Sequence, residues 1–171
     1  MPTRAIVIFP HARDLAEINR LRARFDPLAR VIAPHITVVF PFNTDSGKVD
    51  LRAHVERTIG DVPAFIIRLA GITGGGDKGQ YLFLNVELGS LGVIELHDRL
   101  YSGSLARHLS LDHPYVPHLT LGRVSDPAAF PDALAEASSA NITLTVDVGE
   151  VALVWAPWRK GADGFPAPAF V

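Results

Sequence analysis

The sequence contains no cysteine among its 171 residues. Disulfide frameworks and thiolate metal sites are therefore excluded. Because many exported proteins depend on disulfides, the absence of cysteine favours an intracellular protein, and we expect a cytoplasmic location. The hydrophobic fraction of 48% is typical of a globular chain that buries a substantial core.

Long apolar runs and an excess of basic residues are also absent. The run from Ala5 to Phe9 is too short for a signal-peptide core or a membrane span, so we expect no membrane association. A formal net charge of −2 and a pI near 6.4 argue against a broad basic surface for duplex DNA. We interpret the main positive groups as solvated surface: Arg20, Arg22, Arg24, Arg30, Arg159 and Lys160.

One short unit occurs twice in the chain. Pro34-His35-Ile36-Thr37-Val38 returns 83 residues later as Pro117-His118-Leu119-Thr120-Leu121. Side chains alternate between the two faces of a β-strand, so in each copy the histidine and the threonine should share one face. Proline is tolerated at the first residue of a strand, where its missing N–H does little harm. The sequence therefore predicts two strands that each present an imidazole beside a hydroxyl.

The segments before the two copies follow the same order. Each has an apolar strand, then a helix with apolar residues at spacings of three and four, and then the motif strand. This parallel between residues 5–42 and 81–123 predicts an internal duplication within one domain spanning residues 1–171. The predicted helices are 12–25, 48–59, 92–108 and 127–138, and the further strands are 5–9, 64–72, 81–86, 142–146 and 151–155.

Gly74 to Gly79 could suggest a phosphate-binding loop. However, this glycine run lacks the Lys-Ser/Thr ending of a P-loop and precedes a strand instead of a helix. We therefore interpret it as the tip of a hairpin.

Two histidines and two hydroxyls on one face suit displacement at a phosphodiester. One histidine can take a proton from the attacking water or hydroxyl while the other gives one to the leaving oxygen, and both roles are accessible near neutral pH. The threonines can donate hydrogen bonds to the non-bridging phosphate oxygens. A single such histidine would more often be structural, but repetition of the His and Thr together favours a shared site. No third metal ligand is evident near either motif, so we expect neither a metal nor another cofactor.

The units His35-Ile36-Thr37-Val38 and His118-Leu119-Thr120-Leu121 resemble the two signatures of the 2H phosphoesterase superfamily, and most nearly those of the bacterial 2′-5′ RNA ligase-like, or LigT-like, proteins. The resemblance extends from the first strand through residue 155. It implies a bilobal α+β fold with two pseudo-symmetric lobes, each with a mostly antiparallel sheet and flanking helices, and an active-site cleft between them. It also implies metal-independent action on 2′,3′-cyclic phosphates or 2′-5′ linkages, with His35 and His118 as the catalytic pair.

From this resemblance we expect a monomer that acts on an RNA end or a small nucleotide carrying a cyclic phosphate. Hydrolysis and the reverse 2′-5′ ligation both remain open, as does the assignment of acid and base to the two histidines. Two other functions stay open as well. One is a phosphodiesterase for a small cyclic nucleotide or an ADP-ribose cyclic phosphate, and the other is a non-catalytic module that binds RNA or a nucleotide.

The family's second signature often continues to an arginine, and this chain supplies Arg123 at that place. Strict alternation would turn Arg123 away from His118, because five residues separate them. A bulge at Gly122 could bring it back, so Arg123 is a candidate for binding the substrate phosphate with Thr37 and Thr120.

Aromatic side chains could offer a stacking surface to a base, although packing in the core or tail is the alternative. The candidates are Phe42, Tyr81, Tyr115 and Trp158. The histidines without a threonine at the same spacing are interpreted as surface or structural groups: His11, His54, His97, His108 and His113.

Overall fold

The computed structural model describes residues 2–12, 15–76 and 80–155. Its strands are β1 (Thr3–Ile8), β2 (Ile36–Asn43), β3 (Phe65–Gly75), β4 (Tyr81–Leu88), β5 (His118–Arg123), β6 (Thr143–Val148) and β7 (Ala152–Trp155). Its α-helices are α1 (Ala16–Phe25), α2 (Lys48–Ile59), α3 (Ser90–Leu100) and α4 (Phe130–Ser139), and two 3₁₀ helices are η1 (Gly103–His108) and η2 (Pro127–Ala129). The prediction of an α+β fold is confirmed.

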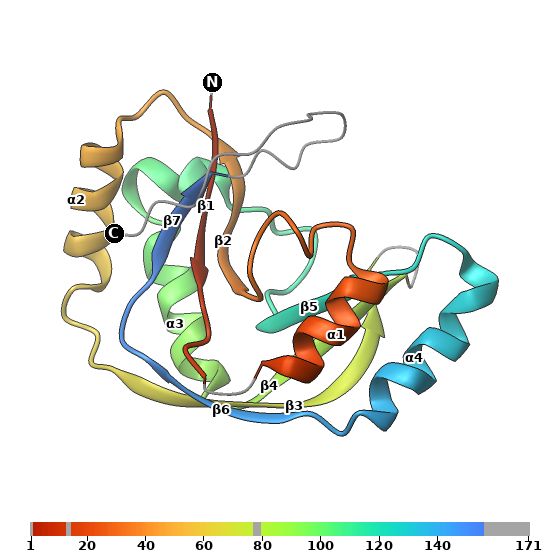
Figure 1. The fold of residues 1–171 in the computed structure, drawn as a ribbon. Coiled ribbons are helices and arrows are strands. Elements are labelled where there is room, and N and C mark those ends of the chain that lie inside the picture. The colour runs from red at the N-terminus through yellow and green to blue at the C-terminus, as the bar shows by residue number, and fades with distance from the viewer. Residues whose placement is uncertain (1, 13–14, 77–79, 156–171) are drawn as a thin grey trace.

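The strands form one sheet in the order β6-β3-β4-β5-β2-β1-β7, and every neighbouring pair is antiparallel. The sheet is strongly curled. β1, β2 and β7 run up the view of Figure 1, whereas β3 and β6 curve across its lower part. The two motif strands, β2 and β5, are neighbours at the centre. They are joined by a single registered pair, Ile36 and Leu119, and the predicted division into two lobes stays a prediction.

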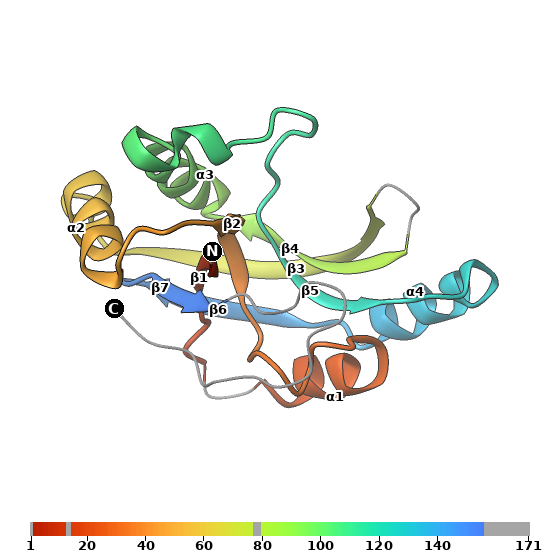
Figure 2. The same cartoon turned by 90° about the horizontal axis from the view of Figure 1, so that it is seen from above.

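The helices are exchanged between the two copies. α1 connects β1 to β2 in the chain but packs mainly on β5, whereas α3 connects β4 to β5 but packs on β2. α2 packs on α3, and α4 packs on β3. Figure 2 shows α2 and α3 on one side of the strands and α1 and α4 on the other. Each motif strand is therefore covered by the helix that precedes the other motif.

The buried apolar side chains form two clusters. The larger contains the aliphatic residues of both motifs, Ile36 and Val38 with Leu119 and Leu121, together with the buried residues of the helices. The smaller one lies on the opposite face of β1 and β7, where Ile32 covers it. Its buried members are Ala5, Val7, Ile32, Ala152 and Val154. Burial of aliphatic side chains on this scale is the main favourable term in folding.

Three predicted helices have different bounds in the structure. The predicted helix 127–138 is η2 followed by α4, which ends at Ser139. The predicted helix 12–25 begins only at Ala16. The predicted helix 92–108 ends at Leu100 and resumes as η1, because Gly103 has a φ of +49°, a left-handed conformation that does not continue an α-helix. No helix in the described part of the chain is both long and apolar enough to cross a bilayer.

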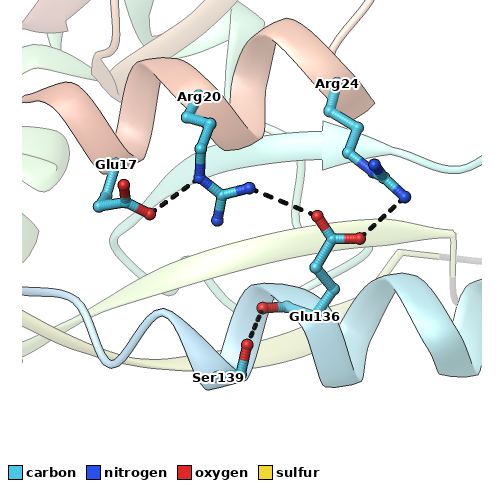
Figure 3. A network of polar contacts seen from close by, with 5 residues as sticks. All are labelled: Glu17, Arg20, Arg24, Glu136 and Ser139. Atoms are coloured by element: carbon cyan, nitrogen blue, oxygen red, sulfur yellow. Dashed lines mark hydrogen bonds and ion pairs between the residues drawn. The ribbon is translucent and has the colours of Figure 1, made fainter.

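The arginines of α1 do not form an open positive patch. Glu136 of α4 accepts from Arg20 and Arg24 at 3.4 and 3.0 Å, and Glu17 pairs with Arg20 at 2.9 Å (Figure 3). The interpretation of Arg22 as solvated surface is wrong, because its side chain is only 2% exposed. Arg159 and Lys160 lie outside the described residues.

Candidate active site

The central pairing of β2 and β5 brings the two motifs together. Ile36 faces Leu119 in antiparallel register. The residues on either side of such a pair also face each other, so each histidine lies across from the threonine of the other strand. The prediction that the two copies contribute to one surface region is met by this geometry.

The two copies have the same pattern of exposure. In both Pro34 to Val38 and Pro117 to Leu121, the proline and the two aliphatic residues are buried, while the histidine and threonine are partly exposed. The predicted alternation is therefore confirmed. The four polar side chains project from the face opposite the main apolar cluster.

Each histidine is held by a carbonyl two residues before it. Nδ1 of His35 lies 2.9 Å from the Ala33 oxygen, and Nδ1 of His118 lies 2.8 Å from the Val116 oxygen. A carbonyl can only accept, so Nδ1 carries the donated proton in both rings. In the neutral imidazole the lone pair is then on Nε2. Both rings have the tautomer that lets Nε2 accept a proton from, or after protonation give one to, a bound group.

The surroundings favour the neutral form of both imidazoles. Although partly exposed, the rings are enclosed by protein atoms, and this desolvation lowers the pKa of His35 to about 4. The positive charge of Arg22 lowers the pKa of His35 further, while the Ala33 hydrogen bond opposes the shift. Desolvation also lowers the pKa of His118, with the Val116 hydrogen bond acting in the opposite direction. Both rings are therefore ready to act as proton acceptors near neutral pH, and a bound phosphate anion would favour their protonation.

Three side chains hold the edge of β2 where it diverges from β5. The hydroxyl of Tyr115 donates to the Thr37 oxygen at 2.8 Å, and the His97 ring lies 2.8 Å from the Val38 oxygen. The rings of His97 and Tyr115 are stacked, with centroids 3.8 Å apart and planes within 4°. The Phe40 N–H donates to the Tyr101 hydroxyl at 3.0 Å. Backbone groups that would otherwise lack a strand partner are satisfied in this way.

A β-bulge turns Arg123 toward the motif face. The register of β5 against β4 shifts by one residue at Leu121. Leu121 and Gly122 are both buried, whereas Arg123 is exposed. A bulge moves the following residue to the other face, so Arg123 shares the face of Thr120. The expected re-aiming is confirmed, and the role of Arg123 in phosphate binding stays a prediction.

The same irregularity occurs in β2. Its register against β1 shifts at Val38 and again between Val39 and Phe42; Val38 and Val39 are both buried, while Phe40 is exposed. Phe40 thus occupies in the first copy the place that Arg123 has in the second. The site is nearly two-fold symmetric in its histidines and threonines but not at this position.

An aromatic residue that the sequence analysis did not single out lies against His118. The ring of Phe83 on β4 is 4.0 Å from the His118 ring between centroids, tilted by 39°. Tyr81, a predicted stacking candidate, is partly exposed and stacks on Phe83 at 5.7 Å. Phe83 could have been identified from the sequence because it lies two residues after Tyr81 in one strand, which places both side chains on one face. His35 has a looser neighbour, because Phe9 lies 6.2 Å away in an edge arrangement.

The remaining candidates have structural surroundings or lie elsewhere. Phe42 is 3% exposed and belongs to the main core, and Trp158 lies outside the described residues. His54 and His97 are buried and bonded to backbone carbonyls, and His11 pairs with exposed Glu150. Among the residues that the structure describes, no three His, Asp or Glu side chains gather closely enough to hold a metal ion.

Comparison with known proteins identifies the family. Residues 10–157 match the model of the 2′-5′ RNA ligase superfamily. The chain belongs to this superfamily of 2H phosphoesterases. A Geobacillus kaustophilus protein named "Putative phosphoesterase" is 30% identical over 132 residues, which cover 77% of this chain and 75% of the relative. A Bacillus cereus protein of the same name is 28% identical over 130 residues, or 75% of this chain and 74% of the relative.

Two solved structures share the fold. The crystal structure of Escherichia coli LigT complexed with 3′-AMP superposes with a TM-score of 0.62 at 20% identity, covering 94% of this chain and 91% of LigT. The TT0787 protein of Thermus thermophilus gives a TM-score of 0.63 at 20% identity, covering 89% of this chain and 87% of that protein. Membership of the superfamily and the named relatives together support a phosphoesterase role and a hydrolase class.

Proposed function

We propose that this 2H phosphoesterase is a metal-independent cyclic phosphodiesterase that opens 2′,3′-cyclic phosphates at RNA or nucleotide ends. The observation that carries the proposal is the pairing of Ile36 with Leu119, which places a histidine and a threonine from each strand on one face. Both imidazoles hold the proton on Nδ1, so both direct the reactive Nε2 away from the backbone.

The reaction follows from these groups. A neutral histidine accepts a proton through Nε2 from a water molecule, whose oxygen attacks phosphorus and forms a new P–O bond. The opposite histidine, protonated when the anionic phosphate is bound, donates its proton to the ribose oxygen as the cyclic P–O bond breaks. The product is a phosphomonoester with a free neighbouring hydroxyl, so protons and atoms balance. Thr37 and Thr120 donate hydrogen bonds to the non-bridging oxygens as charge builds there.

Hydrolysis of adenosine 2′,3′-cyclic phosphate by the purified protein tests the proposal. Replacement of His35 or His118 by alanine should lower turnover about 10²- to 10⁴-fold, which is what general acid–base catalysis contributes. Thermal melts of both variants show whether the fold is kept. Leu91→Ala on α3 is the matched control and should keep full turnover, because this side chain is 79% exposed.

Three results would contradict the proposal. Full turnover in both histidine variants would remove the two-histidine mechanism. Loss of turnover in EDTA, restored by a divalent ion, would favour a metal-dependent reaction. Binding of nucleotide phosphates without any product, over a panel that includes an ADP-ribose cyclic phosphate, would favour the non-catalytic module.

A second turnover experiment distinguishes an RNA substrate from a mononucleotide. Turnover of the mononucleotide is measured against that of an RNA that carries the same cyclic end, with and without a second strand that ends in a 5′-hydroxyl. Faster reaction of the RNA indicates an RNA-end enzyme, and a joined product resistant to 3′-5′ nucleases indicates 2′-5′ ligation. Faster reaction of the mononucleotide indicates a small-nucleotide enzyme.

A further inference from the structure

A continuous strip of planar groups runs along one side of the site. It begins at His118, passes through Phe83 at 4.0 Å and continues to Tyr81, whose ring is 5.7 Å from Phe83 with only 14° between their planes. The guanidinium of Arg123 lies 5.5 Å from the Tyr81 centroid. Phe83 and Tyr81 are both partly exposed, unlike the buried residues that alternate with them on β4. The strip is therefore a surface of the site and not part of the core.

The backbone beneath the strip leaves room for the rings. A Cβ on Gly75 would lie 2.4 Å from the Phe83 ring, and a Cβ on Gly76 would lie 2.6 Å from the Tyr81 ring. Gly76 also has a φ of +92°, which disfavours other residues. Glycine at positions 75 and 76 thus leaves the space that the Phe83 and Tyr81 rings occupy.

The charge at the end of the strip suits an anion. Within the described part of the chain, Arg123 makes no ion pair, in contrast to Arg20, Arg24 and Arg99, which pair with carboxylates. The corresponding position of the first copy is Phe40, so the two copies differ in charge at this position. An aromatic surface that leads from an imidazole to a guanidinium matches a planar base attached to a phosphorylated sugar.

We propose that Tyr81 and Phe83 form a subsite that stacks the base of the substrate nucleotide, so that the nucleoside lies over β4 on the Arg123 side of the phosphate. This inference rests on the proposed function and adds to it the substrate class and orientation. Ribonucleotides with a base are then preferred to cyclic phosphates without one. Stacking depends on area, so purines bind more tightly than pyrimidines.

The experiment compares two cyclic phosphates that have the same reacting group. Adenosine 2′,3′-cyclic phosphate carries a base, and glycerol 1,2-cyclic phosphate carries none. The KM of the base-free compound divided by that of the nucleotide measures what the base contributes. Tyr81→Leu should lower this ratio about 5- to 50-fold, the range that base stacking supports, whereas Tyr81→Phe should keep it because the ring remains.

Phe83→Leu and Phe40→Leu complete the design. Phe83→Leu should lower the ratio as Tyr81→Leu does, and it keeps the test valid if the Tyr81→Leu variant fails to fold. Phe40→Leu is the matched variant at the opposite side and should change the ratio less than Tyr81→Leu. The proposal would be overturned by any of three results. The first is a KM ratio of one in the wild-type protein, and the second is an unchanged ratio in both Tyr81→Leu and Phe83→Leu. The third is a larger loss in Phe40→Leu than in Tyr81→Leu.

A binding measurement separates this inference from the proposed function. Calorimetry with adenosine 3′-monophosphate and with inorganic phosphate needs no turnover. Weaker binding of the nucleotide, but not of phosphate, in Tyr81→Leu supports the subsite even if the wild-type protein opens neither cyclic phosphate, a result that would remove the proposed function alone. Equal binding of the nucleotide by wild type and Tyr81→Leu would overturn the subsite even if turnover is found.

Discussion

The guanidinium of Arg22 and the carboxylate of Asp26 lie 2.8 Å apart, one helical turn from each other, with side chains only 2% and 7% exposed. Arg22 also donates to the Ile32 oxygen at 2.8 Å, and Asp26 accepts from the Leu28 N–H at 2.9 Å. These bonds tie the end of α1 to both ends of segment 28–32, which ends three residues before His35. The pair thus holds the segment whose next carbonyl, that of Ala33, orients the first imidazole.

Arg22→Ala should destabilise the protein by about 3 to 5 kcal/mol, because it leaves the Asp26 carboxylate buried without its partner. Urea denaturation measures the loss. Arg20→Ala is the matched control on the same helix. Its ion pairs are about half exposed, so the expected loss is about 1 kcal/mol or less. Similar losses in the two variants would contradict a structural role of the buried pair.

Acid should destabilise the wild-type protein through His35. Its pKa is about 4 in the folded protein and about 6.5 unfolded. Between these values the unfolded chain binds a proton that the folded chain does not, so the free energy of unfolding falls as pH is lowered from 6.5 toward 4. The expected contribution is of the order of 1 to 3 kcal/mol, reduced from the full shift because the ring is partly exposed.

Thermal melts of wild type and His35→Gln at several pH values measure this contribution. Glutamine does not titrate, so the variant should lose less stability in acid than the wild type. Parallel pH profiles for the two proteins would show that His35 is not the group responsible.

Gly75→Ala should disturb the site through Phe83. The new methyl would lie 2.4 Å from that ring, which must move, and the ring in turn lies against His118. We expect a destabilisation of about 1 to 3 kcal/mol, as for other overpacked positions, together with reduced turnover. Gly149→Ala is the control, because its Cβ would meet only Ala64 at an ordinary 3.9 Å. Calorimetric melts and turnover of both variants make the comparison.

Arg123→Gln should weaken substrate binding about 10- to 100-fold, which is what a lost charged hydrogen bond to an anion costs. The KM for the cyclic phosphate and the dissociation constant of inorganic phosphate should both rise. Arg68→Gln is a control, because Arg68 is exposed and pairs with Glu87 on the neighbouring strand β4. If both variants weaken binding equally, Arg123 acts through the overall charge of the protein and not through a contact with the phosphate.

Much of the local structure could be predicted because the signals are local. Helix α2 has the predicted bounds, Lys48 to Ile59, since Gly60 follows an apolar stripe. Alternation in Pro34 to Val38 was predictable for the same reason. The break after Leu100 was not, because Val93, Leu96 and Leu100 continue a helical pattern up to it and the left-handed Gly103 lies beyond.

Features that depend on distant contacts were harder to predict. The bulge that re-aims Arg123 could only be suspected from Gly122. The structure gives the reason for that glycine, because a Cβ there would lie 2.3 Å from the Cβ of Phe25 at the end of α1. Nothing near Arg22 in the sequence distinguishes it from Arg20 or Arg24, and its burial follows from the path of segment 28–32. The strand order likewise follows from packing between segments far apart in the chain.

The exchange of helices makes the two halves mutually dependent. α1 lies on β5, and α3 lies on β2. A fragment that contains only the first motif would therefore have β2 without the helix that covers it, and α1 without the strand on which it packs. Two fragments cut in the turn after α2 would therefore have to fold around each other.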